Sequence, residues 1–208
     1  MANSFQNEYE TPEITTLAEL AESVIFRVPG CADVMVRKAL RNVYRDFCRR
    51  SHCLVGVRQI SLEYGVNRYP VLPTCGASVY SVRDIYINRR KIEDYRVIAG
   101  TPVCVEIADK YIVNNGEPQY AVVSTVEMPG LESEDIPVWF LEKYGDAIIS
   151  GTIAFLAMMT NKPWSDPAIA GAEKIAYENA INDAVISVAS GGVFANGGID
   201  VYDCSNLL

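Results

Sequence analysis

Residues 137–190 read PVWFLEKYGDAIISGTIAFLAMMTNKPWSDPAIAGAEKIAYENAINDAVISVAS, and this stretch decides the fold of a chain of 208 residues. Apolar residues recur at helical spacing on both sides of a polar segment, residues 161–166. In that segment Asp166 precedes Pro167, a pair typical of a helix start because the carboxylate accepts free backbone N–H groups and proline fits the first turn. The stretch predicts two long helices, one from Pro137 and one over residues 168–189, joined as a hairpin.

Trp164 lies in the turn of this hairpin, and we interpret it as a packing residue rather than a ligand-stacking one. Burying an aromatic side chain of this size contributes about 2–3 kcal/mol, enough to fix the angle between two helices. The residues predicted to shape the hairpin are Pro137, Trp139, Tyr144, Gly151, Pro163, Trp164, Asp166 and Pro167. The alanine-rich second helix is predicted to offer a low-profile face for close helix contact, made of Ala172, Ile175, Ala176, Asn179, Ala180, Asp183, Ala184 and Ser187.

Two further helices are expected before the hairpin. Residues 15–26 carry apolar side chains at helical spacing, with Thr16 and Glu19 placed as a capping box and a Pro-Gly step after the last turn. Residues 32–50 show the most regular helical pattern of the N-terminal half.

The character of the sequence changes between these helices and the hairpin. Short segments rich in Val, Ile and Tyr, broken by Gly, Pro and Asn, are typical of antiparallel strands. Strands are expected at residues 54–62, 78–87, 92–98, 103–107, 111–113 and 119–126. Residues 88–90 and 114–116 are predicted hairpin turns, because Asn and Gly tolerate a positive φ.

The sequence therefore predicts an α+β protein, a bundle of about four helices interrupted by a small antiparallel β-rich insert and followed by an extended C-terminal tail. Residues 1–52 and 131–190 are expected to form one helical domain, with residues 53–130 as the insert and residues 191–208 as the tail. At this length folding buries roughly 70% of the surface of the unfolded chain, so the core needs no disulfide or metal.

The formal net charge of −8 argues against a protein that grips phosphate groups, because such binding needs an excess of Lys and Arg. A net negative charge is expected for a protein surface that DNA passes without adhering, and it is equally typical of an ordinary soluble protein. The longest apolar run, residues 147–159, is too short to span a bilayer, and the polar N-terminus lacks the apolar core of a signal peptide. We expect no membrane role and free thiols in a reducing cytoplasm.

The sequence shows no catalytic, cofactor or metal motif. It lacks phosphate-binding glycine loops, a nucleophile elbow and a zinc-protease helix. Six cysteines form no C-x-x-C pair, and the cluster of Cys48, His52 and Cys53 has no second ligand pair, so a structural role is predicted for it. Glu132, Glu134 and Asp135 are expected to complement a helix dipole. We predict a non-enzymatic protein without cofactor or metal; a small carboxylate-dependent hydrolase is the remote alternative.

Arg37, Arg41, Arg45 and Arg49 stand four residues apart on the second helix. Like charges at this spacing repel one another by a few tenths of a kcal/mol per pair unless an acidic group compensates them. We predict a subunit or partner interface for this stripe. Contact with passing DNA and a simply solvated helix face are the alternatives.

The hairpin resembles the head-to-tail adaptor, or connector, proteins of tailed bacteriophages, including the podovirus tail tubular protein A group. The likeness rests on Trp139-Phe140, Tyr144, Gly151 and Tyr177 together with Lys162-Pro163-Trp164-Ser165-Asp166-Pro167 between two long helices. The helix pair and β-rich insert before the hairpin follow in the same order, so the resemblance covers most of the chain loosely.

The resemblance implies a structural virion protein at the head-tail interface, assembled in the host cytoplasm. Such proteins form a ring, usually a dodecamer, beneath the portal protein and join it to a tail nozzle, tail tube or terminator protein. Genomic DNA then passes through the lumen without sequence-specific binding. The tail residues expected to anchor in the portal are Val193, Phe194, Ile199, Val201, Tyr202, Leu207 and Leu208. A tail-completion or stopper protein is the alternative.

Overall fold

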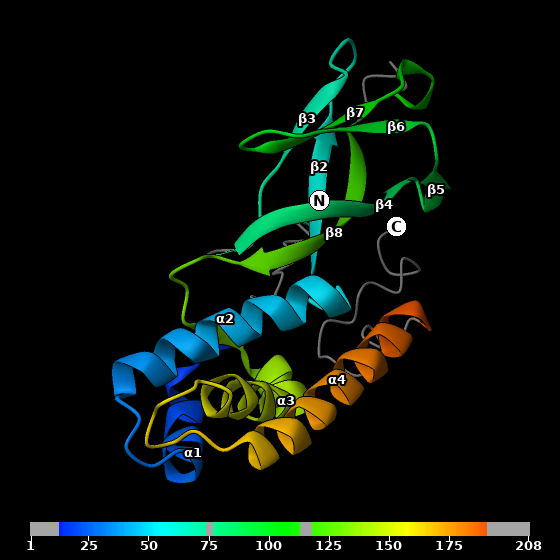
Figure 1. Ribbon diagram of the computed structural model, residues 1–208. Helices are drawn as coiled ribbons and strands as arrows, with labels where there is room; N and C mark the ends of the chain where they lie inside the picture. Colours follow the sequence, from blue (N-terminus) through cyan, green and yellow to red (C-terminus); the bar gives the residue numbers. More distant parts are fainter. Residues whose placement is uncertain (1–12, 74–76, 113–117, 191–208) are drawn as a thin grey trace, which may run out of the picture.

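The computed structural model describes residues 13–73, 77–112 and 118–190 of the chain (Figure 1). Within those ranges the chain is an α+β protein, as predicted, with helices gathered at one end and antiparallel strands at the other. The helices are α1 (Ala18–Arg27), α2 (Asp33–Ser51), α3 (Val138–Ala157) and α4 (Pro167–Ala189), with a short 3-10 helix, η1, at Asp109–Tyr111. The strands are β1 (Ile14–Thr16), β2 (Val55–Leu62), β3 (Arg68–Val71), β4 (Ala77–Ile87), β5 (Arg90–Ile92), β6 (Tyr95–Ile98), β7 (Val103–Ile107), β8 (Gln119–Pro129) and β9 (Asp135–Pro137).

The strands of the described residues pair in the orders β2-β8-β4-β5, β3-β7-β6 and β1-β9, all antiparallel. β8 lies between β2 and β4, and its pairing with β2 runs from Val55 opposite Val126 to Leu62 opposite Gln119. Two register shifts in β4 mark β-bulges, which bend and twist a strand. The β1-β9 pair brings the segment before α1 beside the segment that enters α3.

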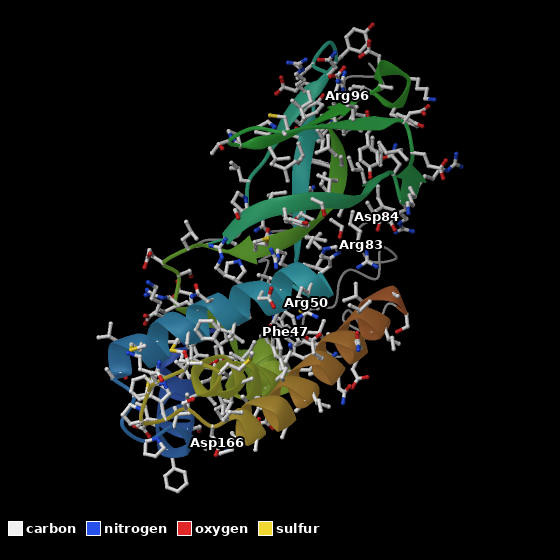
Figure 2. The ribbon with its side chains drawn as sticks, in the orientation of Figure 1. Phe47, Arg50, Arg83, Asp84, Arg96 and Asp166 are labelled. Atoms are coloured by element: carbon white, nitrogen blue, oxygen red, sulfur yellow. The ribbon has the colours of Figure 1, made fainter. Side chains whose placement is uncertain are left out.

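Buried apolar side chains gather in two clusters. One lies among the helices, where α3 packs against α1, α2 and α4, and the other lies among the strands. The two parts also touch, because Arg83 of β4 donates a hydrogen bond to the Val188 carbonyl oxygen near the end of α4, at 3.2 Å (Figure 2). The domain boundaries stay a prediction, since two clusters of buried residues do not by themselves define independent units.

The start of α1 differs from the prediction. Residues 14–16 form β1 because β9 offers them a strand partner, and the helix begins only at Ala18. The predicted capping box is wrong: the Thr15 hydroxyl donates to the Glu19 carboxylate, and the Thr16 hydroxyl accepts the Ala18 N–H at 3.3 Å. A tertiary strand pair thus overrides a local helix-start signal.

Three strand predictions also need correction. The predicted strand at residues 92–98 is two strands, β5 and β6, in different sheets, and residues 109–111 form η1 where a strand was expected to begin. β3 was missed because it contains Pro70, which argues against a central strand. The turn after β4 is a hairpin with positive φ at Asn88 and Arg89, whereas the turn predicted at residues 114–116 lies outside the described residues.

Candidate functional site

The turn between α3 and α4 is closed by Asp166. Its carboxylate accepts hydrogen bonds from the N–H groups of Ala168, at 2.9 Å, and Ile169, at 3.1 Å, and Pro167 occupies the first helical turn. Its own N–H donates to the Ala157 carbonyl oxygen at 3.1 Å, which ties the start of α4 to the end of α3. The side chain therefore caps one helix while its backbone fixes the other.

Replacing Asp166 by alanine is expected to lower the free energy of unfolding by about 1 kcal/mol, the usual loss for an N-cap. Ser165→Ala is the control, because the Ser165 side chain accepts no helix N–H. Urea unfolding followed by circular dichroism measures both. Equal stability of Asp166→Ala and the wild type would contradict the capping role.

Trp164 packs against the helical core from the same turn and is partly buried. Its ring nitrogen is enclosed and has no hydrogen-bond partner among the described residues. Pro163 faces the α1–α2 loop, where its Cβ lies 4.0 Å from the position that a Cβ on Gly30 would take. The α3–α4 turn thus contacts the α1–α2 loop, in line with a packing role for Trp164.

Aromatic rings form the centre of the helical core. Phe47 of α2 lies 5.8 Å from Phe140, 5.1 Å from Tyr144 and 6.0 Å from Tyr177, measured between ring centroids (Figure 2). Trp139 stacks edge-on against Phe140 at 5.6 Å, and Pro137 is the residue from which α3 begins. The hairpin residues named from the sequence are therefore mainly core and turn residues.

Gly151 is a position where α3 lies close to both α2 and α4. A Cβ at this position would lie 2.6 Å from a ring carbon of Tyr177 and 2.7 Å from a methyl group of Val43. Gly171 on α4 is the opposite case, since a Cβ there would meet nothing within 4 Å. One helical glycine is required by packing and the other is not.

Alanine at these two positions is expected to change stability in opposite directions. Gly151→Ala should lower the free energy of unfolding by about 1–3 kcal/mol, because overpacking outweighs the better helix propensity. Gly171→Ala should raise it by about 0.5–1 kcal/mol through propensity alone. Denaturant unfolding of both variants measures the difference, and shifts of the same sign would refute the close approach at Gly151.

A polar network that was not predicted from the sequence joins α2 to α4. The Tyr177 hydroxyl lies 3.2 Å from both the Val43 carbonyl oxygen and the Asp46 carboxylate, and its single proton can be donated to either or shared between them. Arg50 lies 3.5 Å from Asp46 and forms two hydrogen bonds with the Glu178 carboxylate (Figure 2). The Arg50 hydrogen bond lowers the pKa of Glu178, and burial raises the pKa of Tyr177. The sequence carried a signal only for Asp46 and Arg50, which stand four apart on one helix.

The arginine stripe of α2 is partly neutralised within the chain. Arg37 pairs with Asp33 and with Glu134, and Arg41 lies 2.9 Å from Glu132 and 3.7 Å from Glu134. The expectation that Glu132 and Glu134 serve the dipole of α3 is therefore wrong, because β9 lies between them and the helix and α2 lies within their reach.

Arg49 and Arg45 end the stripe differently. Arg49 pairs with Asp46 of its own helix at 2.8 Å, whereas Arg45 makes no ion pair with any residue in the described ranges. A four-residue step also turns about 40° beyond one full helical turn, so the stripe winds from the side of α2 to its outer face. The subunit or partner interface assigned to these four arginines stays a prediction, and Arg45 is the one most available for such a contact.

The low-profile face predicted for α4 is not the face that packs in the core. The residues buried there are Ala170, Tyr177, Ile181 and Ala184. Of the predicted set, only Ala184 is buried, Ala180 and Ser187 are half-buried, and Ala172, Ile175, Ala176, Asn179 and Asp183 are exposed. The helix has small or apolar residues on several sides, so the pattern alone did not select the inner one.

Cys48, Cys53 and His52 sit at the end of α2. Both thiols are fully buried, and the Ser51 hydroxyl contacts the Cys53 sulfur at 2.9 Å. Burial raises the pKa of the Cys48 thiol well above its ordinary value, and the neighbouring Cys53 raises it further. The protonated thiol is therefore favoured. His52 ends the helix in the left-handed conformation at φ 55°. This arrangement suits packing, as predicted for the cluster.

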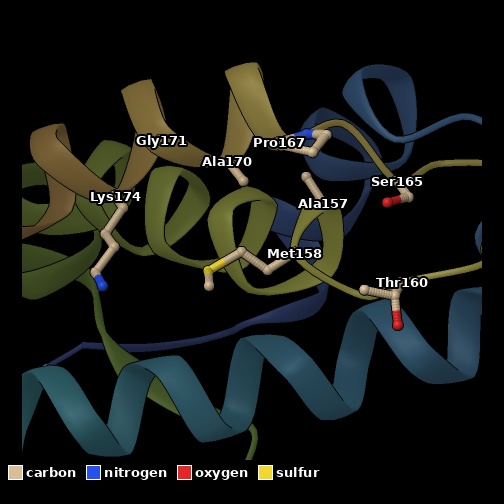
Figure 3. A pocket seen from close by; sticks show the side chains of 8 residues that line it. All are labelled: Ala157, Met158, Thr160, Ser165, Pro167, Ala170, Gly171 and Lys174. Carbon is tan, nitrogen blue, oxygen red and sulfur yellow. The ribbon is translucent and has the colours of Figure 1, made fainter.

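A hollow of about 280 Å³ lies beside the hairpin turn, between the end of α3 and the start of α4 (Figure 3). Its lining residues are Ala157, Met158, Thr160, Ser165, Pro167, Ala170, Gly171 and Lys174. Lys174 brings the charge there, and no acid faces it from the lining. Within the described ranges no three His, Cys, Asp or Glu side chains meet as metal ligands, and no helix has the length and apolarity to cross a membrane.

The proposed portal-anchoring residues, from Val193 to Leu208, lie outside the described residues. No protein-family model matches this chain, and no curated protein matches it in sequence. Among the described residues, the outer sides of α2 and α4 are candidate functional surfaces.

Proposed function

We propose that this chain is a head-to-tail adaptor of a tailed bacteriophage, a non-enzymatic virion protein that forms a ring beneath the portal and joins it to the tail. The observation that carries the proposal is the outer side of α4, which presents exposed Ile175 and Ile186, each 65% exposed, and no charged residue between them on that side. Isoleucine side chains exposed in this way on one uncharged side of a helix are typical of a protein-protein contact.

The helical hairpin supports the same proposal. Its turn carries the Lys-Pro-Trp-Ser-Asp-Pro motif of the resemblance, in which Trp164 packs against the helical core, Pro163 contacts the α1–α2 loop and Asp166 caps α4. The chain would act through surfaces rather than through chemistry, with the portal protein on one side and a tail nozzle, tail tube or terminator protein on the other. With a formal charge of −8 per copy, the ring would let DNA pass without sequence-specific binding.

Capture experiments with the two neighbours test the proposal. The full chain is immobilised and offered the portal protein and the tail nozzle protein of the same virus, separately. An adaptor retains both, whereas a tail-completion or stopper protein retains tail components alone. Failure to retain the portal protein would refute the adaptor function.

A truncated chain tests the role of the tail residues. Removal of residues 191–208 deletes none of the described helices and strands, and cooperative unfolding followed by circular dichroism checks that the shortened chain is folded. Portal capture is expected to fall, because the predicted apolar anchors are removed. Undiminished capture would show that the portal is bound elsewhere on the chain.

A further inference from the structure

The outer side of α4 forms a continuous uncharged row. Its members, spaced three or four residues apart and all exposed, are Ala168, Ala172, Ile175, Asn179, Asn182 and Ile186. The opposite side of the same helix carries Tyr177 and Ile181 into the core. The outer row combines two exposed isoleucines with small or uncharged residues, and its two alanines allow a neighbouring surface to come close.

Acidic residues border this row. Asp183 is exposed on α4, and Glu142 and Asp146 are exposed on the adjacent part of α3, where Lys143 approaches Ser187 at 3.4 Å. None of the three carboxylates makes an ion pair with a residue of the described ranges. Even with the Lys143 ammonium counted, this acidic border is net negative.

The outer side of α2 has the opposite character. Its exposed or half-exposed row is Val34, Lys38, Asn42, Arg45 and Arg49, which contains three cations and no acid. Val34 is 76% exposed, and neither Lys38 nor Arg45 makes an ion pair in the part of the chain that the structure describes. Arg49 pairs with Asp46, so Lys38 and Arg45 are the cations of this basic row that lack an acidic partner among the described residues.

The two surfaces cannot meet within one molecule. α2 and α4 face each other through Val43, Phe47 and Tyr177, with the Tyr177 hydroxyl on the Val43 carbonyl oxygen. The rows described above are exposed, whereas the residues of this contact are buried, so the rows lie on the sides of these helices turned away from it. A basic surface on one side and an acidic, apolar surface on the other are complementary between copies.

We infer that the α4 row with its acidic border binds the basic α2 row of a second copy of this chain, head to tail. The inference rests on the ring-forming part of the proposed function and names the two halves of its interface. Because the halves differ, the contact is heterologous and repeats from copy to copy, which generates a closed ring or a filament. Opposite charges set the register, and Ile175 and Ile186 supply the apolar contact.

Paired charge-reversal variants test the interface. One variant carries Lys38→Glu and Arg45→Glu, and the other carries Asp146→Lys and Asp183→Lys. The wild-type chain is expected to self-associate in sedimentation equilibrium, more strongly at low salt than at high salt. The association constant of each variant alone is expected to be at least about tenfold lower than that of the wild type, because like charges then face one another. An equimolar mixture should recover association, since each contact again joins opposite charges.

Ile186→Asp tests the apolar half, with Tyr64→Asp as a matched control on an exposed residue of the β-rich part. The first should abolish self-association and the second should leave it unchanged. A wild-type chain that stays monomeric, variants that associate like the wild type, or a mixture without recovery would each overturn the inference. Portal capture separates the two proposals: loss of capture with intact self-association refutes the adaptor function alone, and intact capture with unchanged variants refutes this interface alone.

Discussion

Replacing Phe47 by alanine is expected to lower the free energy of unfolding by about 3–5 kcal/mol, the usual range for a fully buried phenylalanine. Phe47 is 0% exposed and lies within 6.0 Å of the rings of Phe140, Tyr144 and Tyr177, so three helices lose a contact at once. The neighbours are held by their own packing and collapse only partly into the vacated volume, which adds a cavity cost to the lost burial.

The control is Phe26→Ala, the same substitution on a ring that is 88% exposed at the end of α1. Its effect should stay within about 0.5 kcal/mol, as for most surface substitutions. Denaturant unfolding monitored by near-ultraviolet circular dichroism measures both. A loss below about 1 kcal/mol in Phe47→Ala would mean that the aromatic cluster does not organise the helical core.

Replacing Arg58 by methionine is expected to cost a similar amount, about 3–5 kcal/mol, because it breaks an ion pair with a buried carboxylate. Glu127 is 1% exposed in the sheet, 3.5 Å from the Arg58 guanidinium. Gly56 lies opposite, and a Cβ there would collide with the Glu127 carboxylate. Arg58 also donates to the carbonyl oxygens of Leu72 at 3.1 Å and Val57 at 2.7 Å, so it ties β2 to the end of β3 as well.

A second substitution separates charge from packing. The double variant Arg58→Met with Glu127→Leu should recover most of the lost stability, because replacing both members of a buried pair by apolar residues is often neutral. Arg68→Met is the matched control, since the Arg68–Glu106 pair is 3.6 Å apart and the arginine is 66% exposed. That pair should contribute less than about 1 kcal/mol. A double variant no more stable than Arg58→Met would show that the lost arginine contacts to backbone carbonyl groups, rather than the lost charge beside the buried carboxylate, carry the effect.

The helices were predictable because their signals are local. Asp166 before Pro167 identified the start of α4, and the apolar periodicity of residues 32–50 gave α2 to within a residue at each end. The strands were less predictable, since β3 contains Pro70 and β1 forms only because β9 lies beside it. Strand pairing depends on segments far apart in the chain, which a local pattern does not contain.

The candidate surfaces show the same division. The sequence identified the arginines of α2 and a small-residue face on α4. It did not show which of these residues are paired or buried within the folded chain. Arg37 and Arg41 find acids in residues 132–134, more than ninety positions away, whereas Arg45 finds none in the described ranges. That outcome depends on the path of the chain between β8 and β9.

By itself the sequence determined the α+β class, the hairpin of α3 and α4, and the capped turn between them, because periodicity, capping and turn chemistry act over a few residues. Only the tertiary structure decided that Tyr177 and Ile181, rather than most of the predicted low-profile face of α4, lie in the core. It also decided that the uncharged row from Ala168 to Ile186 faces outward. A helix with small or apolar residues on several sides specifies no inner face. The Tyr177 ring packs beside Gly151, where the absence of a side chain on the neighbouring helix leaves room for it.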